Sequence, residues 1–158
     1  VSRSGGILQV VSTTKTDTFS TTSTSFSTIT GLSASITPRS TSSKILVIAQ
    51  VAHASSNAAN YGAFKLSGGN TASYVGDDDS GNRVEAVFGG GSNSNTEAML
   101  MSASIVYVDS PSTTSSTTYG VDARANGSTT YVNRSAADEN NVGRVRGASS
   151  ITLMEVAG

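Results

Sequence analysis

The chain has 158 residues and a mass of 16.0 kDa, a length that suits one domain with a hydrophobic core. Its formal net charge is −1 and it contains no cysteine, so we expect no nucleic-acid partner, no disulfide, no thiolate zinc site and no cysteine nucleophile. Only 13% of the residues are charged, whereas Ser and Thr together make up roughly three residues in ten. Because apolar runs recur throughout this background, the composition favours a β protein over a disordered chain.

Short apolar runs, most of them alternating with polar residues, follow one another along the chain. After residues 1–6, which we expect to be a flexible lead and not a signal peptide, turn signals recur at roughly 8–12-residue spacing. We therefore predict a single all-β domain over residues 1–158, an antiparallel sandwich or barrel of about nine to eleven strands. The predicted strands cover residues 7–11, 32–37, 44–52, 61–66, 83–88, 99–109, 118–124, 129–133 and 150–156, with weaker alternation at 15–20, 26–30 and 72–75.

The run from Lys44 to Ala52 is the longest dense apolar stretch, and both of its faces are apolar. In a strand, Ile45, Val47, Ala49 and Val51 share one face, while Leu46, Ile48, Gln50 and Ala52 share the other. One face can pack against a second sheet, and the other needs a cover. Since the sequence has no strong amphipathic helix, this run predicts a partner chain.

Loops separate the predicted strands. Residues 53–60 and 134–148 are polar and are expected to be loops, and the Gly-rich residues 89–95 are expected to be flexible. Asn126-Gly127 is a strong two-residue hairpin signal, which predicts pairing between the strands on its two sides. No apolar run approaches the ~20 residues that a membrane-spanning helix needs.

Carboxylates cluster in one predicted turn. Asp77, Asp78 and Asp79 with Asn82 offer oxygens that suit Ca²⁺, but their spacing departs from the alternating ligands of an EF-hand loop. A solvated turn accounts for the cluster more simply, because Asp is favoured in turns by its local backbone hydrogen bonds. The sequence therefore predicts no metal site and no cofactor.

His53 is the only histidine, and it follows the two-faced strand. A catalytic role would need a nucleophile and an orienting carboxylate in reach, and the chain contains no Gly-x-Ser-x-Gly elbow. No two carboxylates stand in a context typical of a glycosidase pair. We therefore expect no enzyme, and we place His53 at a loop or a subunit boundary.

Tyrosine and arginine supply the remaining candidates for contacts with partners. Most of the tyrosines lie in apolar strand patterns and are expected in the core, whereas Tyr74, beside a Gly/Asp-rich turn, is the candidate for stacking on a sugar. Arg144 and Arg146 can pair with Glu155 across a strand or subunit boundary, or remain solvated rim charges. The predicted subunit-interface residues are Leu46, Ile48, Ala52, His53, Ile105, Tyr107 and Glu155.

Several short stretches together are similar to one known family. They are Leu8-Gln9-Val10-Val11-Ser12, Ile36-Thr37-Pro38 with Ser42 to Val47, Asp109-Ser110-Pro111 before Tyr119, Tyr131 to Ser135, and Ser150 to Gly158. On these residues the chain resembles small domains of tailed bacteriophages, notably viruses of cyanobacteria and other aquatic bacteria, that serve as tail-fibre-like or virion structural proteins. Nothing in residues 55–95 carries this resemblance.

The resemblance implies a jelly-roll-like sandwich that associates as a homotrimer with other virion proteins on the particle surface. The expected function is non-enzymatic, either host adhesion through a tail fibre that binds a host surface glycan, or decoration of the capsid. A carbohydrate-binding module of a bacterial surface protein remains the alternative, and exposed tyrosines gathered on one sandwich face would favour it.

Overall fold

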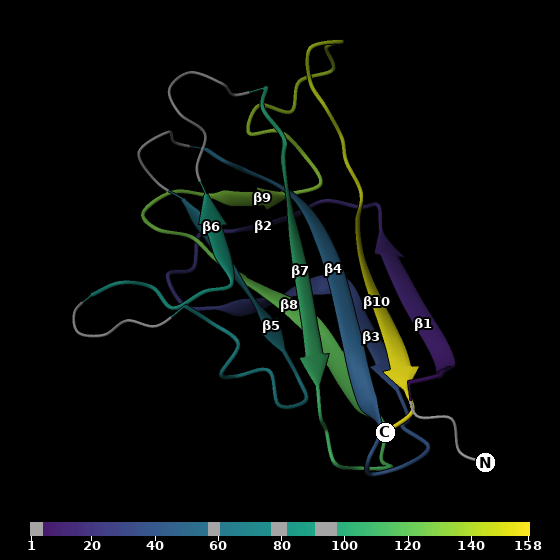
Figure 1. Cartoon of the computed structure of the whole chain (residues 1–158). Coiled ribbons are helices and arrows are strands. Elements are labelled where there is room, and N and C mark those ends of the chain that lie inside the picture. The colour runs from purple at the N-terminus through teal and green to yellow at the C-terminus, as the bar shows by residue number, and fades with distance from the viewer. Residues whose placement is uncertain (1–4, 57–60, 77–81, 91–97) are drawn as a thin grey trace.

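The computed structural model describes residues 5–56, 61–76, 82–90 and 98–158, and within them the chain is built of ten strands without a helix. The strands form two facing layers, and the start of β1 lies at the same end of the sandwich as the C-terminus (Figure 1). The strands are β1 Ile7–Lys15, β2 Phe19–Thr21, β3 Ser27–Ile36, β4 Lys44–Ser55, β5 Gly62–Ser67, β6 Phe88–Gly90, β7 Met101–Asp109, β8 Thr117–Arg124, β9 Thr130–Val132 and β10 Ser149–Val156.

The strand order is that of a jelly roll. Sheet A runs β1-β10-β4-β7, and the short strands β9 and β2 extend it beside the end of β4. Sheet B runs β3-β8-β5-β6. Every pairing is antiparallel. Apart from the short strands β2 and β9, the chain changes sheet at each step from β1 to β5 and again from β6 to β10, as in the two Greek keys of a jelly roll. The predicted all-β, jelly-roll-like antiparallel sandwich is therefore confirmed.

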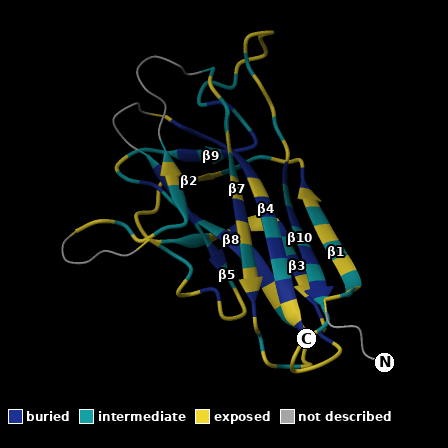
Figure 2. Cartoon of the chain, viewed as in Figure 1, coloured by how far each residue is buried: buried dark blue, intermediate teal, exposed yellow. Residues whose placement is uncertain are grey.

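A single hydrophobic core lies between the sheets. From sheet A it takes Ile45, Val47, Ala49 and Val51, which were predicted to share one face of the strand and are each 0% exposed. Sheet B contributes large side chains such as Leu32, Phe64 and Tyr119. Because successive side chains of a strand point to opposite faces, more buried and less buried residues alternate along most of β1, β4, β7 and β10 (Figure 2).

Several predicted boundaries differ from the structure. The alternations at 26–30 and 32–37 form one strand, β3, which shifts register near Gly31, a glycine with a φ of +81°. Residues 53–55, predicted as loop, continue β4, because their main chain pairs with β9. Residues 72–75 form no strand, and the predicted strand 83–88 survives only where β6 pairs with β5 from Phe88 onward.

The Asn126-Gly127 turn does not close a hairpin, so that prediction is wrong. β8, which precedes the turn, pairs with β3 and β5 in sheet B, whereas β9, which follows it, pairs with β4 and β2 in sheet A. The chain therefore crosses from one sheet to the other here. Gly127 has a φ of +69°, so the residue signal correctly marks a tight turn. A turn signal is local and does not specify which strands pair.

Candidate functional site

The outer face of sheet A carries an apolar surface that no part of the described chain covers. The register places Val10, Met154, Leu46 and Val108 in one row across the four main strands. The next row holds Ser12, Thr152, Ile48 and Val106. Val10 and Val106 are each 55% exposed and Val108 is 51% exposed. We call these six apolar side chains, Val10, Leu46, Ile48, Val106, Val108 and Met154, the apolar face.

The character of sheet A's outer surface changes along the strands. The third row across the sheet consists of Thr14, Ser150, Gln50 and Ser104, which are polar and uncharged. The apolar face thus occupies the half of the sheet nearest the chain ends (Figure 1), and none of the three rows contains a charged residue. The next row towards the chain ends pairs Val156 with the exposed Lys44, so a charge enters this surface only at its edge.

The size of this surface is suitable for an interface. Four strands spaced ~4.8 Å apart and about eight residues long span on the order of 500 Å². Two such faces together bury about 1,000 Å², the lower bound for a specific protein–protein contact. The apolar face makes up about half of this area, on the order of 250 Å², and the uncharged polar row beside it makes up the rest. The outer surface of sheet A is therefore the candidate functional site.

The flanking strands extend the same surface. Among the described strands β1 pairs only with β10, and β7 pairs only with β4, so each has one free edge. The β1 sequence from Ile7 to Lys15 contains no proline and only one charge, Lys15, whose side chain is 1% exposed. Charge and proline are the usual protection against strand addition at an edge. The β1 edge therefore lacks that protection.

The predicted interface residues divide into two groups. Leu46 and Ile48 lie in the apolar face, as the alternation in β4 predicts. Ala52, His53, Ile105 and Glu155 are between 0% and 8% exposed within the single chain, so their placement at a subunit boundary is wrong. Tyr107 is half-buried on the inner side of β7 and packs against the core. The alternation of β7 makes Val106 and Val108 the outward residues instead.

His53 is enclosed by aromatic rings. Its ring centroid lies 4.9 Å from that of Phe64 and 5.7 Å from that of Phe88. Its Nδ1 is buried without a hydrogen-bond partner in the part of the chain that the structure describes. Burial lowers the pKa of His53 from 6.5 to about 4, because desolvation penalises the imidazolium ion. His53 is therefore a neutral core residue near pH 7.

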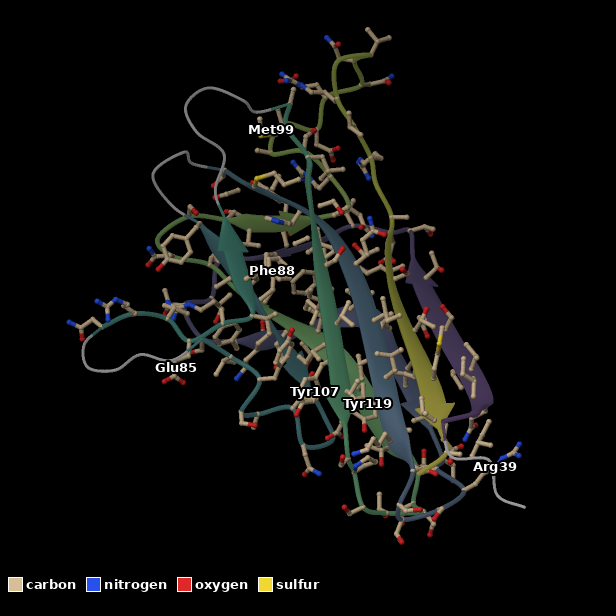
Figure 3. All side chains as sticks on the ribbon, in the orientation of Figure 1. Arg39, Glu85, Phe88, Met99, Tyr107 and Tyr119 are labelled. Carbon is tan, nitrogen blue, oxygen red and sulfur yellow. The ribbon has the colours of Figure 1, made fainter. Side chains whose placement is uncertain are left out.

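Two buried carboxylates close the end of the sandwich nearest the termini. Glu155 accepts hydrogen bonds from the Gln9 side-chain amide at 2.6 Å and from the Arg39 N–H at 2.7 Å. Burial alone would raise the pKa of Glu155, but the hydrogen bonds from Arg39 and Gln9 and the other polar groups around the carboxylate outweigh it and lower the pKa. Arg39 is at this end of the molecule (Figure 3). Glu155 thus anchors the 37–39 segment.

Asp109 is the second of these buried carboxylates, and it binds the 68–71 turn and Tyr119. It accepts a hydrogen bond from the Tyr119 hydroxyl at 2.6 Å and one from the Asn70 N–H at 3.1 Å. Burial and the hydrogen bond to Asp109 both raise the pKa of the Tyr119 phenol, so it remains a donor throughout the physiological range. Asp109 is 1% exposed, so it fastens the 68–71 turn and is not open to a substrate.

Glu155 does not pair with the arginines that the sequence offered. Arg144 contacts Glu139 at 2.8 Å and Arg146 contacts Asp138 at 2.6 Å, so all four side chains belong to the long β9–β10 connection. Of the two alternatives for these arginines, the pairing with Glu155 is therefore wrong. The loop brings the arginines to carboxylates a few residues away, whereas Glu155 lies inside the sandwich.

The outer surface of sheet B is polar and charged. Thr28, Asp122 and Lys65 are aligned across its strands, and Ser35 and Thr118 share a hydroxyl hydrogen bond of 2.7 Å. The Lys65 ammonium lies 4.7 Å from the centre of the Phe26 ring. This charged and hydroxyl-rich surface differs from the outer surface of sheet A, which carries the apolar face.

The predicted sugar contact, Tyr74, has both its ring and its hydroxyl engaged. Its ring stacks on Tyr107 with centroids 4.5 Å apart, and its hydroxyl donates to the Val106 carbonyl at 2.9 Å. Tyr74 is half-buried and packs on the core, so its predicted exposure is wrong. It instead caps part of the free edge of β7.

The predicted metal candidates Asp77, Asp78 and Asp79 lie outside the described residues, and Asn82 is exposed. Within residues 5–56, 61–76, 82–90 and 98–158, no three His, Cys, Asp or Glu side chains approach closely enough to hold a metal ion. The same ranges contain no helix long and apolar enough to cross a membrane. Comparison with known proteins finds no match to a family model and no significant match to a curated protein.

Four of the six residues of the apolar face were missed from the sequence. Val10, Val106, Val108 and Met154 stand in strands whose two faces are both partly apolar, so alternation alone does not say which face is covered. The signal that finds them is the register, because Leu46 and Ile48 on β4 align with Val108 and Val106 on β7.

Proposed function

We propose that this chain is a non-enzymatic structural protein of a bacteriophage, displayed on the particle surface as a homotrimeric tail-fibre adhesion domain or capsid decoration protein. The observation that carries the proposal is the uncharged apolar face on the outside of sheet A. A monomer gains nothing from exposing Val10, Val106 and Val108 to water, whereas a symmetric assembly removes them from it.

Three further features support this function. The jelly-roll sandwich is the architecture that the phage resemblance implies. The start of β1 and the C-terminus lie at the same end of the sandwich (Figure 1). That end of the sandwich can attach to a particle, while the opposite end of the sandwich projects away from it. In an assembly, weak contacts to a host surface are repeated by symmetry and gain avidity through raised effective concentration.

The alternative, a carbohydrate-binding module on a bacterial surface protein, would use exposed aromatic rings on one sandwich face. Tyr119 is fully buried, and Tyr74 and Tyr107 stack on each other. We therefore rank this alternative below the virion role.

Light scattering of the purified chain tests the proposal. The expected mass is three times that of the 16.0 kDa chain. Immunogold imaging of particles with a C-terminal label on this domain then separates a fibre from a capsid location. A strictly monomeric chain at high concentration, or particles without label, would overturn the virion proposal.

A further inference from the structure

The connection between β9 and β10, residues 133–148, is the longest described segment without a regular strand, and we call it the β9–β10 loop. Loops longer than about 12–15 residues in compact domains are usually functional or disordered. Two main-chain hydrogen bonds join the first residues of this loop to its last residues. The Ser135 N–H donates to Val145 O at 3.1 Å, and the Gly147 N–H donates to Asn133 O at 3.1 Å.

Buried hydrogen bonds fix the base of the loop to the sandwich. Asn133 is 0% exposed, and its side-chain amide donates to the carbonyls of Lys15 at 2.8 Å and Asp17 at 2.9 Å. The Ser149 hydroxyl donates to Asn133 Oδ1 at 2.6 Å and accepts from the Ala52 N–H at 3.0 Å. This network joins the loop to β1, β4 and β10, so its position is set by the rigid core.

Ion pairs shape the upper part of the loop. Arg146 holds both oxygens of Asp138 in a fork, with two distances of 2.6 Å. Arg144 donates twice to one oxygen of Glu139, at 2.9 and 2.8 Å. Arg134 adds a third cation 3.5 Å from Asp138. These contacts orient the carboxylates before any ligand arrives, which removes part of the ordering cost of binding.

The paired side chains line an open hollow of about 330 Å³. This volume stands at the lower end of the range for small-molecule sites, about 300–1,000 Å³. Every lining residue is polar or charged, and both signs are present: Asp138, Glu139, Asn140, Asn141, Arg144 and Arg146. A simple anion would meet the two carboxylates, and a simple cation would meet the two arginines.

A neutral polyhydroxylated ligand fits this lining better than either ion, because each sugar hydroxyl both donates and accepts a hydrogen bond. Carboxylate and amide oxygens accept, while amide and guanidinium N–H groups donate. We propose that the hollow of the β9–β10 loop binds one or two neutral sugar residues of a host surface glycan.

The position of the loop agrees with this ligand. The loop lies at the end of the sandwich opposite both chain ends (Figure 1), and its Val142 side chain is fully exposed. A domain attached through its termini would present this hollow outward. The choice of a host glycan as the source of the sugar rests on the proposed virion function, whereas the preference for a neutral sugar rests on the lining alone.

The test is a titration of the whole ¹⁵N-labelled chain, followed by amide NMR, with glucose, galactose, mannose, rhamnose and N-acetylglucosamine up to about 100 mM. Glucuronate and glucosamine serve as charged analogues. We expect at least one neutral sugar to shift the amide signals of Asn140, Asn141 and Gly143, and both charged analogues to bind more weakly.

Variants distinguish the loss of ligand-binding groups from a change in the conformation of the loop. Glu139→Ala and Asn140→Ala remove hydrogen-bonding groups, and Asn140→Ala leaves both ion pairs in place. Each should weaken the best sugar about tenfold. Val142→Ser, in the same loop but outside the lining, is the matched control and should bind as the wild type does.

The inference is overturned if no neutral sugar shifts these amides, if Asn140→Ala binds unchanged, or if a charged analogue binds more tightly. Light scattering of the same samples keeps the two proposals apart. A trimer without sugar shifts refutes the sugar site alone, whereas sugar shifts on a monomer support the site and count against the virion assembly.

Discussion

The outer surfaces of the two sheets obey the same alternation yet have opposite chemistry. Sheet A presents Val106 and Val108, more than half exposed, in rows without charge, whereas sheet B presents Lys65, Asp122 and hydroxyl side chains. The inner faces of both sheets pack against the same core, so burial within the chain does not explain why the two outer surfaces differ in polarity. The contrast makes the outer surface of sheet A, and not that of sheet B, the candidate contact surface for the proposed assembly.

The largest effect is expected on the inner side of sheet A. Val47→Asp buries a carboxylate without a partner at a position that is 0% exposed, which should cost about 4 kcal/mol or more of unfolding free energy. Urea denaturation followed by circular dichroism measures this loss. Thr118→Asp, on the outer surface of sheet B, should change stability by less than about 1 kcal/mol. Wild-type stability in Val47→Asp would contradict the assignment of the faces.

The dependence of folding stability on pH tests the same inner face, because His53 is buried there. Its pKa is about 4 in the folded chain and 6.5 when unfolded, so the unfolded state binds more protons between these values. Stability should therefore fall as pH drops from about 6.5 to about 4, by on the order of 3 kcal/mol. The pKa of Glu155 is also lowered on folding, so its contribution is lost only at lower pH, as the pH falls through its folded value.

Denaturant midpoints measured from pH 7 to pH 4 provide the comparison, with His53→Leu as the control. The variant should show a flatter profile over this window, whatever its stability at pH 7. An equally steep fall in the variant would assign the acid sensitivity to other groups.

The apolar face itself is tested by Val106→Asp. A charge in the middle of the interface should weaken association by at least about 2 kcal/mol, roughly thirtyfold, because it must be desolvated on assembly. The melting temperature of the isolated chain should stay close to the wild-type value, since Val106 is 55% exposed. Sedimentation velocity measures the association, and Thr118→Asp should assemble normally. Equal loss of assembly in both variants would remove the distinction between the two sheets.

The smallest expected change in the association constant comes from Val108→Thr. Val108→Thr keeps the shape of the side chain but adds a hydroxyl, and should weaken association about fivefold, or ~1 kcal/mol. The converse change, Thr118→Val on sheet B, should leave the association constant unchanged. Dissociation constants from dilution series distinguish these outcomes, and a stronger effect at Thr118 would place the interface on sheet B.

Local patterns determined much of the fold. The alternation in residues 44–52 separated the two faces of one strand, the run 150–156 predicted another strand, and the polar run 134–148 predicted the long loop. These predictions hold because side-chain direction in a strand depends only on the position of each residue along it.

Only the tertiary structure decided which strands pair and what their pairing brings together. It made Asn126-Gly127 a crossover between sheets, buried His53 and Glu155, and aligned Leu46 with Val108 and Met154. It also folded residues 138–146 around a polar hollow. The physical reason is that strand pairing joins residues distant in sequence, so alternation identifies the two faces of each strand but not the neighbours that cover them.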